Sequence, residues 1–356
     1  MAATYQVNAN GNVFTVVDDC TTVYRAIVTG GAADEIFGTL DAPGFAVELQ
    51  RTDLGTKACD NGLYALTGYP GNSFPQLATT GYTVNYVLTA PGFRDLPMIA
   101  NIPVNAVFPV PADAAAMRRL PVRIQGRVVS TSRVPIPGAL IASIDNPASP
   151  PTAHTTALRS PLYFAHANSS AVQTVTIGVA SSATLQQAVE SGDQVITVST
   201  RTGLAANSIV RLTGNAGVQL EYATVDHLGP GPAASPGQVF LKNALNQSYA
   251  VAGTAVDFVS ATLGGAADKL SADANVGDGV VLANALFSST IAFELGTAVE
   301  EIHEVGALSD SNGYYGLDGI GRVRELFLLA TQGALKLMVD WFVEYDQPLN
   351  LVDFRL

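Results

Sequence analysis

The chain has little charge, little cysteine and no long apolar run, and each shortage argues against a class of protein. Only 13% of its 356 residues are charged, whereas an ordinary soluble domain has about 25%. The net charge of −12 gives no basic surface, so no nucleic-acid partner is expected. No segment approaches the roughly 20 apolar residues of a membrane helix, so no membrane span is expected. A surface this poor in charge favours an assembly subunit partly covered by neighbours, although a low-charge monomer from an unusual lineage would have the same composition.

Cysteine usage and the first residues of the chain indicate the compartment. Two cysteines, Cys20 and Cys59, are too few for a disulfide framework. We interpret them as reduced, partly buried thiols rather than as a disulfide pair. Residues 1–10 lack a basic segment followed by an apolar core, so no signal peptide is predicted. These features predict synthesis and folding in the cytoplasm.

The sequence also lacks the common catalytic motifs. None of its four histidines has a glutamate three residues later, as a zinc-binding His-x-x-Glu pair requires. These histidines are His154, His166, His227 and His303. No His-Glu-x-x-His, Gly-x-x-x-x-Gly-Lys-Ser/Thr or Gly-x-Ser-x-Gly motif occurs. The sequence therefore predicts a non-enzymatic protein with no catalytic residues, no metal and no other cofactor.

Short β segments are what the sequence has in quantity. Residues 1–110 alternate runs of β-branched and aromatic residues with clusters of Gly, Pro, Asn and Asp, which is typical of an antiparallel sandwich. Residues 111–119 instead predict a short helical linker, because Pro opens the segment, alanines fill it and two arginines close it. The fold class predicted is all-β, with further β domains after the linker.

Two turn motifs of similar sequence stand far apart in the chain. Each combines Asp and Asn, which hydrogen-bond to their own turn, with a Gly that tolerates positive φ. The turn residues are Asp60, Asn61 and Gly62 in the first copy and Asp310, Asn312 and Gly313 in the second. A tyrosine follows each glycine closely and suits the start of a strand. Two copies of one turn predict two copies of one small domain.

The second copy belongs to a β unit that is interrupted. Residues 122–129 and 139–144 predict strands joined by a turn at Pro137 and Gly138. The pattern then breaks and resumes only at Asp310. The predicted boundaries are 120–148 plus 306–356 for a second sandwich and 149–305 for an inserted β module.

The inserted module contains internal repeats, which predict similar β units that pack on one another. Residues 185–196 parallel residues 270–281 without a gap, and Glu221-Tyr-Ala-Thr-Val resembles Glu301-Ile-His-Glu-Val. A third similarity links residues 158–175 with residues 241–259. We interpret the module as one full repeat and two partial ones.

Two polar features of the module each have a structural and an ion-binding interpretation. Asp193 and Asp278 follow glycines at matched turns, and we interpret them as turn residues, because calcium would need more oxygen ligands close by. The segment Glu300-Glu301-Ile302-His303-Glu304 combines carboxylates with an imidazole. We interpret it as a solvated edge strand, with a cation site as the alternative.

Three segments of the second β unit form a family pattern. They are Gly126 in a first strand, Pro137-Gly138-Ala139 before a second strand, and Asp310-Ser-Asn-Gly313-Tyr at a turn. Together they resemble the carboxypeptidase regulatory-like domain, a transthyretin-like β-sandwich. The first unit is similar at Asp60-Asn-Gly-Leu-Tyr but has Ala42-Pro-Gly-Phe in place of Pro-Gly-Ala. The resemblance implies two transthyretin-like sandwiches, the second interrupted, and it implies almost nothing about function.

The Gly-Asp-x-Val repeats of the module are similar to β repeats of phage-tail and tail-like particle proteins. With the low charge, this similarity predicts a structural subunit of a phage-tail-like or contractile injection assembly, such as a baseplate, cap or tail accessory protein. Its partners would be other subunits of a virion or virion-like particle, including further copies of itself. The alternative is an adhesin module that binds a carbohydrate or a cell surface. Its aromatic residues on loops would be Tyr69, Phe74, Tyr82 and Phe93.

Trp341 and Phe342 lie in an apolar patch near the C-terminus. Packing inside the sandwich is the interpretation we favour for Trp341, with an interface role as the alternative, and Phe342 is a candidate interface residue. Edge strands are the natural contacts in such an assembly, because their unpaired backbone groups can extend a neighbour's sheet.

Overall fold

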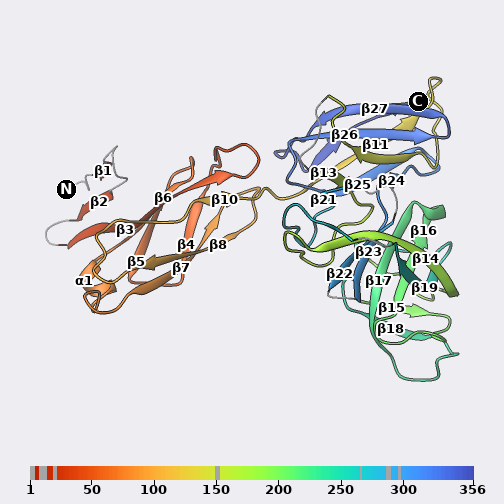
Figure 1. Ribbon diagram of the computed structural model, residues 1–356, viewed down its shortest axis with the longest axis horizontal. Helices are drawn as coiled ribbons and strands as arrows, with labels where there is room; N and C mark the ends of the chain where they lie inside the picture. The colour runs from red at the N-terminus through yellow and green to blue at the C-terminus, as the bar shows by residue number, and fades with distance from the viewer. Residues whose placement is uncertain are drawn as a thin grey trace. The chain divides into compact units, whose positions relative to one another are not determined.

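The computed structural model describes residues 5–7, 14–18, 22–148, 153–264, 267–285, 290–295 and 298–356. Strands are by far the main regular secondary structure of these residues, so the all-β prediction is confirmed. The chain divides into two compact units, residues 1–120 and 121–356 (Figure 1). No helix in the described ranges has the length and apolar character needed to cross a membrane.

The first unit is a sandwich of two sheets. One sheet has the order β1 (Tyr5–Val7), β2 (Phe14–Asp18), β3 (Thr22–Asp34), β6 (Leu63–Gly68) and β5 (Leu54–Ala58). The facing sheet has the order β4 (Ala46–Leu49), β7 (Tyr82–Thr89) and β8 (Leu96–Ile102). A single turn of helix, α1 (Pro70–Ser73), lies between β6 and β7 in the chain. Ile27, Leu66 and Leu88 from the two sheets meet in one core.

The helix predicted over residues 111–119 is wrong. This segment contributes β9 (Val110–Pro111) and β10 (Ala115–Met117), which pair in parallel with β3. Ala115 and Met117 are buried while Ala116 is exposed, which is the alternation of a strand. Pairing with β3 and burial of Met117 outweigh the weak helical preference of the alanines.

The second unit contains a sandwich assembled from both of its ends. One sheet has the order β25 (Tyr314–Ile320), β11 (Val122–Val129) and β28 (Leu349–Leu351), and β29 (Phe354–Arg355) also pairs with β11. The facing sheet has the order β24 (Ala307–Leu308), β12 (Leu140–Ile144), β26 (Glu325–Gln332) and β27 (Leu335–Phe342). Ile141, from before the insertion, and Leu317, from after it, lie in one core.

The two turn motifs have the same geometry in the two sandwiches. Gly62 has a φ of 83° and Gly313 a φ of 81°. The backbone N–H of Ala32 donates to the Gly62 carbonyl at 2.9 Å, and that of Val128 donates to the Gly313 carbonyl at 2.8 Å. A Cβ at either glycine would lie within 2.4 Å of a carbonyl oxygen on the neighbouring strand. Both positions therefore require glycine for backbone conformation and for space.

A tyrosine packed over a glycine is the second device that the sandwiches share. Tyr64 pairs with Gly30 across β3 and β6, and Tyr315 pairs with Gly126 across β11 and β25. The Tyr315 hydroxyl donates to the Val352 carbonyl at 2.7 Å. Gly126 leaves room for this tyrosine and for the Val352 carbonyl, since a Cβ there would lie 1.7 Å from that oxygen.

The inserted module has two halves with separate cores. Its strands are β13 (His154–Ala157), β14 (Ala171–Thr184), β15 (Val195–Val198), β16 (Ile209–Gly214), β17 (Gln219–Leu228), β18 (Gly237–Leu241), β19 (Ala255–Leu263), β20 (Asp268–Lys269), β21 (Val280–Ala283), β22 (Ile291–Leu295) and β23 (Ala298–His303), with a 3₁₀ turn η1 (Asn215–Gly217) between β16 and β17. The long strand β14 passes through both halves, because it pairs with β19 in one and with β22 in the other.

The sequence repeats occupy equivalent places in these halves. The carboxylate of Asp193 accepts the backbone N–H of Glu190 at 2.8 Å, and that of Asp278 accepts the N–H of Asn275 at 2.8 Å. These bonds support the interpretation of both aspartates as turn residues.

Candidate functional site

The acidic segment on β23 lies at the edge of its sheet as expected, but it is buried, so the prediction that it is solvated is wrong. Glu301 is 4% exposed and His303 is fully buried. β23 pairs with β22, and Ile302 packs with Tyr222 of β17 in a small core. Successive side chains of β23 do alternate between its two faces, as the interpretation as a strand assumed. Both faces, however, contact other parts of the module.

The Glu301 carboxylate is the centre of a buried polar cluster. It accepts backbone N–H bonds from Tyr163 at 2.9 Å and from Phe164 at 3.3 Å. It also bonds to His166 Nε2 at 2.5 Å and to His303 Nε2 at 2.8 Å. Both carboxylate oxygens are thus saturated by groups of the chain itself.

Electrostatics keep this carboxylate ionised. Burial raises the pKa of Glu301, but the attraction of His303 and the hydrogen bonds from His166, His303 and the Tyr163 N–H outweigh burial and lower the pKa to about 2. No group of three or more His, Cys, Asp or Glu side chains in the described ranges is placed to hold a metal ion. The cluster holds the 163–164 loop against β23, so its role is structural.

Glu221 performs the same task in the other half of the module. Its carboxylate accepts the backbone N–H of Asn246 at 3.0 Å and of Gln247 at 3.3 Å, and the Tyr163 hydroxyl donates to it at 2.6 Å. Burial raises the pKa of Glu221, and its hydrogen bonds oppose that effect. The sequence repeat had aligned Glu221 with Glu301, and this alignment was the signal that both glutamates are structural.

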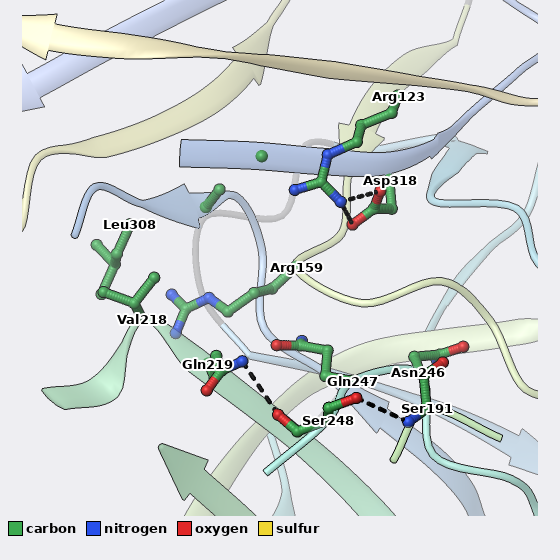
Figure 2. Close-up of a pocket in the computed structure, with 12 residues that line it drawn as sticks. Arg123, Arg159, Ser191, Val218, Gln219, Asn246, Gln247, Ser248, Leu308 and Asp318 are labelled. Atoms are coloured by element: carbon green, nitrogen blue, oxygen red, sulfur yellow. Dashed lines mark hydrogen bonds and ion pairs between the residues drawn. The ribbon is translucent and has the colours of Figure 1, made fainter. Parts of the chain in front are cut away.

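A polar cleft of about 360 Å³ lies between the second sandwich and the inserted module. Figure 2 shows Arg159 beside Val218 and Gln219, with the ion pair of Arg123 and Asp318 across from them. Arg123 Nη1 lies 2.7 Å and 2.9 Å from the two Asp318 oxygens. Sequence patterns gave no indication of this cleft, because its lining comes from both sides of the insertion boundary.

The cleft is lined by polar side chains, including two arginines, two serines and an aspartate. Burial lowers the pKa of Arg159, against the attraction of Glu304. The Gln219 side-chain amide donates to the Ser248 carbonyl, and the Ser248 hydroxyl accepts the Ser191 N–H. The Ser248 hydroxyl also donates to the Glu190 carboxylate at 2.7 Å, and Asp318 adds a second carboxylate to the lining.

The outer side of the sheet β12-β26-β27 carries a group of apolar side chains together with the polar residues Glu325, Thr331, Lys336 and Asp340. Strand register places alternate residues of the three strands on this side, away from the sandwich core. The apolar members, called here the outer face, are Leu140, Ala142, Ile144, Phe327, Leu329, Met338 and Phe342. Met338 is 43% exposed and Phe342 is 58% exposed, while the other members are half-buried.

Trp341 and Phe342 point to opposite sides of this sheet. Trp341 packs against the sandwich core, and its indole N–H donates to Asn350 Oδ1 at 3.0 Å. Phe342 belongs to the outer face. Packing inside the sandwich therefore accounts for Trp341, and the interface role stays a prediction for Phe342 alone.

The first unit provides an internal comparison for the outer face. Its sheet β4-β7-β8 has the same order and antiparallel pairing as β12-β26-β27. The corresponding outward positions are Ala46, Glu48, Thr83, Asn85, Val87, Thr89, Pro97, Ile99 and Asn101. Five of these nine residues are polar, the apolar ones are Ala46, Val87, Pro97 and Ile99, and Pro97 interrupts the backbone donors of the edge strand. An apolar outer side is thus not needed to fold this kind of sandwich.

The predicted turn residues lie where their chemistry is used. Asp310 Oδ1 accepts the backbone N–H of Asn312 at 2.8 Å. Gly138 has a φ of 69°, and the Pro137 carbonyl accepts the Gln332 side-chain amide at 3.3 Å.

In the first copy, the carboxylate reaches a more distant partner. Asp60 Oδ1 accepts the N–H of Gly44 at 3.3 Å, whereas Asn61 Oδ1 accepts the N–H of Leu63 at 3.3 Å. Asp60 therefore ties its turn to the segment that precedes β4.

The aromatic residues expected on adhesin loops are mostly buried. Phe74 is 2% exposed and Phe93 is 7% exposed, so both are core residues and their predicted exposure is wrong. Tyr82 is half-buried and stacks edge-on against Phe74. Of these four residues Tyr69 alone is exposed, so the four do not form an aromatic platform.

Cys59 is a free thiol and is exposed rather than partly buried as expected. Cys20 lies outside the described residues.

Comparisons with known proteins identify no family. No family model and no curated protein matches the chain. Two crystal structures of BcpA, the major pilin subunit of Bacillus cereus, are similar at 9% and 10% identity, with TM-scores of 0.19 and 0.20. Each alignment covers 92% of this chain and 98% of the pilin chain. Similarity at this level supports no inference about fold or function, so the chain is assigned to no family.

Proposed function

We propose that this protein is a non-enzymatic structural subunit of a larger protein assembly, and that the outer face is one of its contacts. The observation that carries the proposal is the group of large apolar side chains on the outer side of β12-β26-β27, which the outer side of the matching sheet in the first unit has in smaller number. Because both sheets belong to the same kind of sandwich, folding alone does not account for the difference.

The energetics favour coverage of the outer face by another protein. Fully burying an exposed side chain such as Met338 or Phe342 contributes about 1.5–3 kcal/mol each, and the half-buried Phe327 and Leu329 add less. Contiguous apolar patches on soluble proteins mark interaction sites, since they otherwise promote aggregation. The low share of charged residues, 13%, agrees with a surface that is partly covered by other subunits in the assembly.

For the type of assembly, the Gly-Asp-x-Val repeats of the inserted module support a phage-tail-like or contractile injection particle. In such a particle the chain would be a baseplate, cap or tail accessory subunit, made in the cytoplasm and contacting other subunits. Purification from a host that carries the neighbouring genes, followed by mass spectrometry of co-purifying proteins, tests this part separately.

Size-exclusion chromatography with light scattering tests the central proposal. The full chain is expected to form discrete oligomers, or to co-purify with particle components. The variant Phe327→Thr/Met338→Thr/Phe342→Thr should weaken that association, whereas Ile99→Thr, an exposed residue on the corresponding strand β8, should not. A compact wild-type monomer at all concentrations, with no co-purifying component, would contradict the proposal.

A further inference from the structure

Strand β27 has one paired edge and one open edge. Within the described part of the chain it pairs with β26 alone, in an uninterrupted register from Leu335 to Phe342. It contains no proline or bulge, whereas the corresponding edge strand β8 contains Pro97. A long and regular edge can pair with another chain, and the exposed charges of Lys336 and Asp340 restrict which chain fits it.

We propose that two copies of this chain pair through β27, antiparallel, about a two-fold axis at Met338. The two four-stranded sheets then join into one continuous sheet, and the two outer faces lie on the same side of it. This inference rests on the proposed function and names a second copy as the occupant of the edge.

Charge complementarity selects both the partner and the register. On the outer side of β27, Lys336 stands two residues before Met338 and Asp340 two residues after it. A two-fold axis at Met338 therefore places Lys336 of each copy directly opposite Asp340 of the other. Opposite charges that face each other across strands stabilise a sheet. An axis at Leu337 or Val339 would place an apolar residue opposite each of these charges.

The surroundings of Asp340 within one chain also favour a cation opposite it. Glu325 lies near it on β26, and the pKa of Glu325 is raised by slight desolvation, a hydrogen bond with Asp340 and the repulsion of that carboxylate, against the attraction of Arg324. Two neighbouring carboxylates on an exposed edge favour the approach of a cation. In the proposed dimer, Lys336 of the second copy supplies that cation.

The proposed dimer has closed two-fold symmetry, so no further copy can add to it by the same contact. A two-fold axis uses the same edge of both copies, so the contact consumes the open edge and leaves none to propagate. Further association then takes place through the joined outer faces rather than through strand addition. This explains how an edge free of proline avoids endless sheet growth.

Disulfide trapping tests the register directly. In a Cys20→Ser/Cys59→Ser background, Met338→Cys should form a disulfide-linked dimer on mild oxidation, because facing Cα atoms lie about 4.5–5.5 Å apart, within disulfide reach. The matched control is Lys336→Cys, whose two copies would lie on the order of 14 Å apart and should not cross-link. Lys336→Cys/Asp340→Cys should cross-link again.

Charge exchange tests the contact without cysteine. Lys336→Asp should raise the dimer dissociation constant at least tenfold, measured by sedimentation, because it places like charges opposite each other twice. The swap Lys336→Asp/Asp340→Lys should restore the wild-type value. Lys242→Asp, the same change at an exposed position on the inserted module, is the control and should leave it unchanged.

The outcomes separate this inference from the proposed function. If the wild-type chain associates but Met338→Cys does not cross-link and Lys336→Asp has no effect, the β27 dimer is wrong while the structural role stands. If the wild-type chain neither associates nor co-purifies with other subunits, the structural role itself fails.

Discussion

The buried Glu301 cluster yields a prediction that separates a structural role from a solvated strand. Glu301→Ala removes the acceptor of two backbone N–H groups and of two histidines, His166 and His303, all in the interior of the module. Removing one partner of a buried charge-assisted network costs about 3–5 kcal/mol, because the remaining groups stay buried and unpaired. We expect Glu301→Ala to lower the free energy of unfolding by about 4 kcal/mol.

The neighbouring Glu300 is the matched control. It lies on the same strand, its side chain is 22% exposed, and its carboxylate is 3.7 Å from His166 Nδ1. Glu300→Ala should therefore cost less than about 1 kcal/mol. Urea denaturation followed by circular dichroism measures both, and hydrogen exchange of β23 shows that the loss lies in the module. Equal and small losses for the two variants would refute the structural role of Glu301.

The same cluster predicts how stability depends on pH. The pKa of Glu301 in the folded chain is about 2, below its usual 4.5. A lowered pKa contributes stability that is complete above the unfolded value and is lost as pH falls through the folded value. Glu301 should therefore contribute about 3 kcal/mol above pH 5, lost progressively between about pH 4.5 and 2. In Glu301→Gln the acid-induced loss over this range should be smaller by about that amount, as measured by urea midpoints.

Three further changes have defined expected outcomes. Gly313→Ala should destabilise the second sandwich by more than about 2 kcal/mol, since it needs positive φ and meets the Val128 carbonyl; denaturation followed by Trp341 fluorescence measures this, and an unchanged midpoint would contradict it. Tyr315→Phe should cost about 1 kcal/mol through loss of the buried hydroxyl bond, in the same assay. Cys59→Ser should change stability by less than about 0.5 kcal/mol, because the thiol is exposed and free. A larger effect of that change would indicate a contact that the structure does not show.

Local chemistry in the sequence was sufficient for the turns and for the strands that they join. Gly62 and Gly313 were identifiable because a turn with positive φ has few solutions in residue type. The link between Ile141 and Leu317 could also be inferred, because the family pattern places their strands in one sandwich. These features depend on residues close together in the chain, or on a pattern repeated within it.

Features that depend on tertiary packing were not predictable. The alanines of residues 111–119 favour a helix locally, but the edge of β3 decides their conformation. The burial of Glu301 depends on the 163–164 loop, which lies far away in the chain. The outer face required the register of three strands, since Ile144, Phe327 and Phe342 become neighbours only in the folded sheet.

The pairing of β11 with β25 also sets the order in which the parts of the chain fold during synthesis. The first unit is complete once residue 120 has been made, so it folds while the rest is still being synthesised. β11 and β12 are made next, but their partners β24 to β29 emerge only after the whole inserted module. The module therefore folds while β11 and β12 still lack their partner strands. The second sandwich is the last part of the chain to fold. Substitutions that slow folding of the module should accordingly raise the loss of newly made chains more than they lower the stability of finished ones.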